Sequence, residues 1–219
     1  MKVNLNWVTP KAEEAILKIA RVSSSRKDKT SNPEGLINYL IKHAHWSPFE
    51  HGHLSVEIET SKAIGIQLIR HRSFTFQEFS QRYQDVNKAG NNLFEPIELR
   101  AQCEDNRQSS TEVINPEIKV EGGYVKASDL IYEHLSRTHD LYDQLLEAGV
   151  AREQARMVLP LATTTKIHMT GSIRSWIHFL KLRDDDHAQK EIQLVAKEIK
   201  SIFIQEFPII SKALGYEAE

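Results

Sequence analysis

Cysteine is nearly absent from this chain of 219 residues, since Cys103 is the only one. A single cysteine excludes an intrachain disulfide framework and any zinc site that needs several cysteines. An excess of one charge sign is absent as well, because 28 basic and 30 acidic residues give a formal net charge of −2. The sequence therefore lacks the global basic field that attracts nucleic acid, and we expect no nucleic-acid partner.

Long apolar runs are also missing. The stretch IGIQLI at 64–69 is among the longest, and it is far too short to cross a bilayer. The first eight residues, MKVNLNWV, lack the apolar run of a signal peptide. With 40% hydrophobic and 26% charged residues, the composition is that of a soluble globular protein. We expect a cytoplasmic protein with no membrane partner, folded as a single domain over residues 1–219.

The pattern of apolar residues predicts more helix than strand. The elements do not alternate regularly, which favours an α+β fold with an antiparallel sheet over a doubly wound one. A polar loop is expected at 23–31 and a long surface excursion at 101–123. Strands are expected at 3–8, 54–59, 93–99 and 161–169, and helices at 10–22, 33–41, 61–70, 124–147, 150–158, 172–182 and 186–207.

The densest polar segment is 70–83, RHRSFTFQEFSQRY. Its fourteen residues include three arginines, a histidine, a glutamate and four aromatics. If its second half is extended, Glu78, Ser80 and Arg82 project from one face, because strand side chains repeat every two residues. Gln67 shares a helical face with Arg70, so its amide could lie in the same pocket as these side chains. Such a row suits a ligand with hydroxyls and a phosphate, although surface arginines that only pair with acids are the alternative.

Two further clusters carry polar side chains. Four of the ten histidines lie within 43–53, where a metal site is one interpretation and a turn formed by His45, Ser47 and Glu50 is the better one. Near the C-terminus, four further side chains are spaced as neighbours on predicted helices. Arg152 shares a helix face with Arg156, and Arg174 shares one with His178, while Arg183 is expected at the end of its helix.

The acidic run at 184–186 is read as a helix start, with a magnesium site as the alternative. No positioned base lies beside Cys103 in the sequence, and we treat this thiol as non-catalytic.

Several of these motifs occur together in one known family. Arg70-His71-Arg72, seven further residues and Ser80 resemble the Arg-His-Arg-x7-Ser motif of the flavin-dependent thymidylate synthases. The blocks HWSPFEH at 45–51, ARMVLP at 155–160 and HAQ at 187–189 also resemble blocks of that family, in family order. The sequence departs from the family pattern at Thr75, Gln77 and Ser172, where serine, asparagine and asparagine are usual.

The resemblance implies an α+β subunit of a homotetramer with active sites where subunits meet. It implies methylation of dUMP to dTMP with 5,10-methylenetetrahydrofolate as carbon donor, FAD as redox carrier and NADPH as reductant. The implied catalytic residue is Arg183. The implied nucleotide contacts are Gln67, Arg70, Glu78, Phe79, Ser80, Gln81, Arg82, Arg156 and Arg183, and the implied cofactor contacts are His45, Ser47, Glu50, Arg70, His71, Arg72, Ser73, Glu78, Ser172, Arg174 and His178.

Two other classes of function compete with this interpretation. A metal-dependent nucleotide hydrolase would be built on the histidines at 43–53. A single-stranded nucleic-acid-binding domain would use the arginines together with Phe74, Phe76 and Phe79 as a stacking platform. No metal is expected in the flavoenzyme interpretation, and its bound flavin would colour the protein yellow.

Overall fold

The computed structural model describes residues 1–23, 32–89, 92–107 and 109–216. Its centre is an antiparallel sheet of four strands in the order β1-β2-β8-β3. The strands are β1 (Lys2–Val8), β2 (His53–Ser61), β8 (Thr164–Ser172) and β3 (Phe74–Glu78). The fold is therefore α+β with an antiparallel sheet, as the sequence predicts.

One face of the sheet forms the main core. Val56 pairs with Met169 and Ile58 with Ile167 across β2 and β8, and all four side chains are fully buried. Since alternate side chains of a strand share a face, the regular apolar alternation in β2 directs this ladder inward. Burying a side chain of this size contributes about 1.5–3 kcal/mol, so this apolar face sets the register of the two strands.

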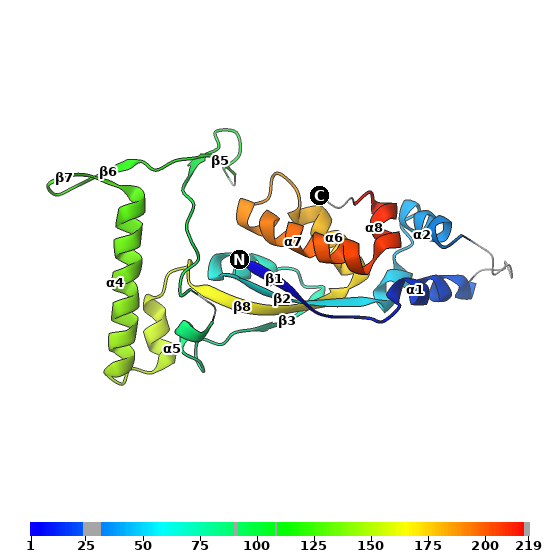
Figure 1. Ribbon diagram of the computed structural model, residues 1–219, viewed down its shortest axis with the longest axis horizontal. Helices are drawn as coiled ribbons and strands as arrows, with labels where there is room; N and C mark the ends of the chain where they lie inside the picture. The colour runs from blue at the N-terminus through cyan, green and yellow to red at the C-terminus, as the bar shows by residue number, and fades with distance from the viewer. Residues whose placement is uncertain (24–31, 90–91, 108, 217–219) are drawn as a thin grey trace.

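Helices cover that face (Figure 1). α6 (Ile173–Arg183) and α7 (Lys190–Glu206) lie over the sheet, and α1 (Ala12–Ala20), α2 (Pro33–Lys42) and α8 (Pro208–Leu214) are grouped at one end of it. Asn32 caps α2 by accepting a hydrogen bond from the Glu34 amide at 3.0 Å, with Pro33 in the first turn. Trp176 of α6 is fully buried and donates its ring N–H to the Leu54 carbonyl at 2.9 Å, which joins α6 to β2.

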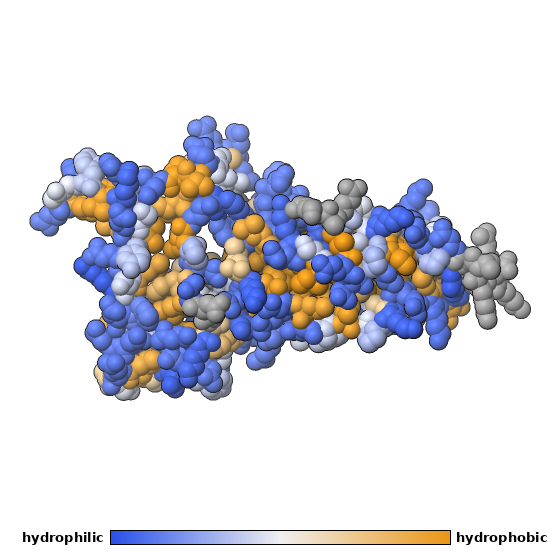
Figure 2. Space-filling model, viewed as in Figure 1, coloured by the Kyte–Doolittle hydropathy of each residue, from blue (hydrophilic) through white to orange (hydrophobic). Residues whose placement is uncertain are grey.

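A second group of elements projects beyond the sheet as an arm (Figure 1). It consists of β4 (Arg100–Gln102), β5 (Ser110–Val113), β6 (Glu117–Val120), β7 (Gly123–Lys126), α4 (Ala127–Glu147), α5 (Arg152–Ala155) and the 3-10 turn η4 (Arg156–Val158). A small separate core of Val86, Tyr142 and Ala155 holds α4, α5 and the 3-10 turn η3 (Val86–Lys88) together. Apolar side chains are exposed along this arm, and Figure 2 shows apolar surface there.

Most predicted elements are present, but four predictions differ from the structure. The strand expected at 93–99 is reduced to one isolated bridge between Phe94 and Thr163. The segment 101–123 is a mostly exposed surface excursion as expected, but it contains β5, β6 and parts of β4 and β7, which were not predicted. The strands of these two hairpins are mostly exposed, so they carry no regular apolar alternation that would have revealed them. Part of the loop expected at 23–31, residues 24–31, lies outside the described residues.

The end of the chain also differs from prediction. The acidic run at 184–186 does not start a helix, because α7 begins only at Lys190. Instead Asp184 caps the end of α6, and its carboxylate accepts a hydrogen bond from Lys200 at 2.8 Å. The helix α8 is not among the predicted helices, the last of which ends at 207, and Pro208 lies in its first turn. Among the described residues, no helix is both long and apolar enough to cross a membrane.

Candidate active site

Glu50 joins the histidine-rich turn to the start of α6. It lies in the 3-10 turn η2 (Ser47–His51), and its carboxylate accepts hydrogen bonds from Ser172 Oγ at 2.6 Å and from Arg174 at 2.8 Å. The hydrogen bond from Ser172 is the main reason that the pKa of Glu50 is lowered. Residues more than a hundred positions apart are thus brought together because β2, which follows η2, pairs along its whole length with β8, which precedes α6.

A cavity of about 1010 Å³ opens beside this group. Its lining includes four of the predicted cofactor contacts, Glu50, Ser73, Arg174 and His178. Ser175 ties α6 to the arginine-rich segment, because its hydroxyl donates to the Ser73 carbonyl at 3.3 Å. The cavity combines apolar walls with hydroxyl, carboxylate, imidazole and guanidinium groups, a donor set that suits a large ligand with an aromatic ring and anionic groups.

His71 and Arg183 form the second part of the site. Arg183 Nε donates to His71 Nε2 at 2.9 Å, which places the proton of the neutral ring on Nδ1. His71 is only 9% exposed and packs edge-on against Phe179. Burial, assisted by the positive charges of Arg183 and His178, lowers the pKa of His71 from 6.5 to about 4. At neutral pH the imidazole is therefore an uncharged acceptor that orients a partly buried guanidinium at the end of α6, where the sequence predicts it.

Glu78 and Gln67 belong to the third part. Glu78 Oε1 accepts hydrogen bonds from Lys62 at 2.7 Å and from Thr165 at 2.8 Å, so that the carboxylate is held by α3 (Lys62–Leu68) and β8. Gln67, also on α3, donates to the side-chain oxygen of Gln189 at 2.6 Å.

Gln81 contains an unsatisfied buried donor. The residue is 8% exposed, and its side-chain nitrogen Nε2 has no hydrogen-bond partner among the described residues. Leaving a buried amide donor unpaired costs about 1–3 kcal/mol. Such an atom is typical of a position that is completed by a ligand or by another chain.

The predicted row of Glu78, Ser80 and Arg82 is wrong as a strand face. Strand β3 ends at Glu78, and Ser80 begins a turn in which its carbonyl accepts hydrogen bonds from the amides of Tyr83 and Gln84. Arg82 is exposed and lies over the ring of Tyr83, 5.5 Å from its centroid. The chain turns here because the strand pairing ends. The Phe79 amide donates the last backbone hydrogen bond to β8, to the Lys166 carbonyl.

The remaining predicted arginines are spread over the molecule. Arg70 and Arg72 are exposed in the segment between α3 and β3, and Arg156 is half-buried at the start of η4 on the arm. Arg152 and Arg156 keep the predicted helical spacing, because the Arg156 amide donates to the Arg152 carbonyl at the end of α5, although α5 has only four residues and a 3-10 turn follows it. Among the described residues, no hydrogen bond or ion pair joins Arg82 or Arg156 to Arg183 in the single chain.

The histidine turn does not assemble the metal site considered above. His43 and His45 contact each other and Tyr39 as aromatic rings, with His45 at 5.7 Å from Tyr39 between centroids. No group of three or more histidine, cysteine, aspartate or glutamate side chains in the described ranges is arranged to hold a metal ion. His45 and Ser47 are both exposed on the rim beside Glu50.

The sequence matches the family model described as thymidylate synthase complementing protein over residues 4–209. The chain belongs to this family. It is 40% identical to a probable flavin-dependent thymidylate synthase of Paramecium bursaria Chlorella virus 1, over 94% of this chain and 91% of the relative. It is 39% identical to a flavin-dependent thymidylate synthase of Synechocystis, over 93% and 90%.

The fold is similar to that of a solved structure as well. A UMP/dUMP methylase, PolB from Streptomyces cacaoi, crystallised with 5-Br dUMP, superposes with a TM-score of 0.77 at 27% identity, over 98% of this chain and 94% of the other. The recognition of a flavin-dependent thymidylate synthase from the sequence motifs is therefore confirmed.

Family membership leaves no support for the nucleic-acid interpretation. Phe74 is 9% exposed and packs edge-on against Trp176 in the main core, with 4.6 Å between ring centroids. A stacking platform needs exposed rings, so the prediction that Phe74 presents one is wrong.

Several residues that shape this thymidylate synthase site were missed from the sequence. Lys62 and Thr165 hold Glu78, Ser175 holds Ser73, and Gln189 holds Gln67. Only Gln189 carried a signal, because it lies in the HAQ block at 187–189. The others are ordinary polar residues whose partners are distant in the sequence, and no local pattern reveals such pairs.

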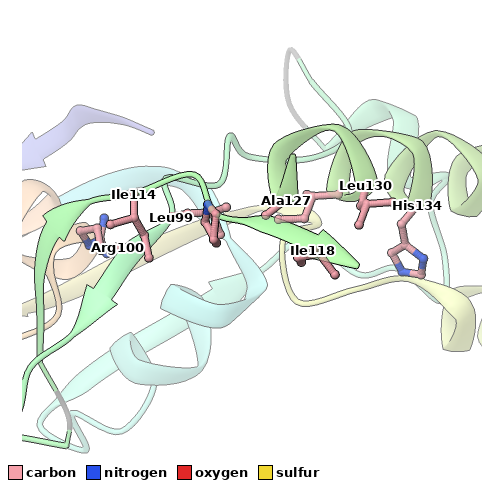
Figure 3. Close-up of a pocket in the computed structure, with 9 residues that line it drawn as sticks. Leu99, Arg100, Ile114, Ile118, Ala127, Leu130 and His134 are labelled. Atoms are coloured by element: carbon pink, nitrogen blue, oxygen red, sulfur yellow. The ribbon is translucent and has the colours of Figure 1, made fainter. Parts of the chain in front are cut away.

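A further pocket lies on the arm of this synthase and is distinct from the site. Its volume is about 390 Å³, and apolar side chains from the hairpins and α4 line most of it, with Arg100 and His134 at its edge (Figure 3). It offers an apolar surface rather than a set of catalytic groups.

Proposed function

We propose that this protein methylates dUMP to dTMP, taking the carbon from 5,10-methylenetetrahydrofolate and the reducing equivalents from NADPH. Its family membership and its likeness to a dUMP methylase support this assignment. The chemistry of the site is consistent with it, because the chain needs no thiolate nucleophile and its single cysteine, Cys103, lies in the β4–β5 hairpin on the arm.

The contact between Arg183 and neutral His71 is the observation that carries the proposal. As carbon 5 of the uracil becomes nucleophilic, negative charge develops on the ring oxygens. The guanidinium of Arg183 keeps donors besides the one that His71 accepts, and these would stabilise the anion. A preorganised donor of this kind contributes about 3 kcal/mol. A protonated His71 would repel Arg183, so the low pKa of His71 keeps the cation in place.

The nucleotide would be held by groups that now lack partners or face solvent. The unsatisfied Nε2 of Gln81 supplies a donor for the nucleotide. Arg82 and Arg156 would bind the phosphate in a bidentate manner, since neither guanidinium is committed to a carboxylate among the described residues. Phe79, Ser80 and Gln67 complete the proposed set of contacts.

FAD, when bound, supplies the redox chemistry of this reaction. The cavity beside Glu50 has the size and donor set to accept it, with Arg174 and His178 as cationic or hydrogen-bonding partners. Glu50 accepts hydrogen bonds from Ser172 and Arg174 and thereby orients both side chains at the start of α6. Ser47, Ser73, Arg72 and His45 are proposed to contact the cofactor from the rim.

A homotetramer is the proposed assembly, with active sites between subunits. Two observations support it. The arm carries exposed apolar side chains, including Ile114 and Ile118, which are 37% and 44% exposed. The proposed phosphate arginine Arg156 lies in η4 on the arm, whereas Arg183 ends α6 beside the sheet, so a second copy that brings its own arm to the sheet would complete the site.

Turnover of dUMP by the purified protein tests the function. We expect dTMP formation that requires the folate donor, reduced nicotinamide and FAD together, and a yellow protein as isolated. UMP should be assayed in parallel, because the Streptomyces protein is a UMP/dUMP methylase. A protein that binds flavin but forms no methylated product from either nucleotide would contradict the proposal.

A further inference from the structure

A polar cavity separate from the one beside Glu50 lies between the β4–β5 hairpin and the start of α7. Its volume is about 400 Å³, and Arg107, Ser109 and Thr111 line it from the hairpin, while Asp186, Gln189 and Gln193 line it from the other side. None of these residues except Gln189 takes part in the site described above.

The hairpin loop that forms one wall is held by a single side chain. The amide nitrogen of Gln102 donates to the carbonyl oxygens of Cys103, Asn106 and Ser109, at 3.1, 3.2 and 3.0 Å. Backbone groups that would otherwise need water are thus satisfied inside the loop. Arg107, between the held carbonyls of Asn106 and Ser109, lines the cavity.

The basic side chains of the cavity differ in whether they form ion pairs. Arg100 is bound by Glu98 and Glu191, at 2.9 and 2.6 Å, and Lys190 is bound by Glu98 at 2.7 Å. In contrast, the guanidinium of Arg107 forms no ion pair or hydrogen bond with any residue that the structure describes, and Asp186 lies in the same lining without pairing with it. An arginine with five uncommitted donors, next to the hydroxyl of Ser109, is suited to bind an oxyanion. Thr111 lines the cavity beside them, and its hydroxyl donates to the Ala101 carbonyl at 3.5 Å.

The cavity also lies next to the proposed nucleotide site. Gln189 lines the cavity, and its side-chain oxygen accepts the hydrogen bond from Gln67, a proposed nucleotide contact, at 2.6 Å. Gln189 therefore belongs to the wall of the cavity and also contacts a residue of the proposed nucleotide site. This shared residue suggests a ligand that reaches both, with its acidic group at Arg107.

We propose that Arg107, with Ser109 and Thr111, forms an anion subsite for a cosubstrate and binds a carboxylate or phosphate at the end distant from the reacting atoms. The subsite rests on the proposed function, because both cosubstrates of that reaction are acidic: the folate ends in glutamyl carboxylates and NADPH carries phosphates. The shared chemistry is an oxyanion, and the two sources are separated by experiment.

The test compares Arg107→Gln with the wild type and with Lys119→Gln. Lys119 is an exposed cation on the neighbouring β6–β7 hairpin that does not line the cavity, so its loss is a matched charge control. KM is measured for the folate donor with one and with several glutamates, for NADPH and NADH, and for dUMP. Binding of each cosubstrate is also followed by calorimetry, which needs no turnover.

Loss of a charge-assisted contact is expected to raise KM and Kd for one cosubstrate by about tenfold or more, with kcat little changed. A rise for the folate that grows with glutamate number assigns the subsite to its carboxylates. A rise for NADPH that is absent for NADH assigns it to the additional phosphate. Arg107→Lys should recover most of the affinity in either case.

Values for both cosubstrates within twofold of wild type, or the same rise in Lys119→Gln, would overturn the subsite. A rise confined to dUMP would overturn it too, because the anion would then belong to the nucleotide. The proposed function fails separately, by the absence of dUMP and UMP turnover in the wild type.

Discussion

Replacing His71 by glutamine tests whether a buried, uncharged ring orients Arg183. Glutamine keeps an acceptor for the Arg183 donor but does not titrate. The pKa of His71 falls from 6.5 in the unfolded chain to about 4 in the folded protein. A group whose pKa is lowered by folding contributes its stability above the unfolded value, and this contribution is lost as the pH falls from about 6.5 toward 4.

The expected size follows from these two values. Relative to pH 7.5, the wild type should lose about 1 kcal/mol of unfolding free energy at pH 5.5 and about 2–3 kcal/mol at pH 4.5 from this one group. Because some solvent reaches the ring, these values are upper bounds. His71→Gln should lack this component, so the difference in stability between the two proteins should change with pH by up to this amount.

Urea denaturation of the cofactor-free protein, at one protein concentration and at pH 7.5, 6.5, 5.5 and 4.5, measures the difference. His51→Gln, at an exposed histidine of the same protein, is the control and should follow the wild type. If wild type and His71→Gln lose stability in parallel across this range, His71 is not the buried neutral acceptor described here, and the reasoning about Arg183 fails with it.

Four further outcomes are expected. Arg183→Ala should lower dUMP turnover by about 100-fold, while flavin absorbance per subunit stays near that of the wild type; near-normal turnover would refute its role. Cys103→Ala should leave turnover intact, and complete loss of dTMP formation would show that the thiol takes part. Gly171→Ala should destabilise the protein by about 1–3 kcal/mol, because the added Cβ would collide with the ring of Phe74 in the core; an unchanged thermal midpoint would contradict this packing. Gln81→Leu should raise the KM for dUMP without lowering stability, since it removes a buried donor that has no partner, and a loss of stability would mean that the amide is satisfied in the protein.

Local patterns in the sequence were sufficient to predict many of the helices and strands. The alternation at 54–59 predicts β2, and the Asn-Pro pair at 32–33 predicts the start of α2, because both signals are local consequences of side-chain periodicity and of capping. The exposed hairpins β4–β5 and β6–β7 were missed for the same reason, since no buried face imposes a period on them.

For the candidate site, too, some features could be predicted from the sequence and others depend on tertiary packing. The family could be read from short motifs such as RHR at 70–72, because chemistry requires particular side chains at particular spacings, while the roles of the individual side chains stay predictions. The neutral state of His71, and the lack of a partner for the Gln81 amide and the Arg107 guanidinium among the residues that the structure describes, depend on burial and on the packing of other elements. Desolvation and hydrogen bonding arise only when distant segments pack together, and for that reason the tertiary structure decided what the sequence motifs could not.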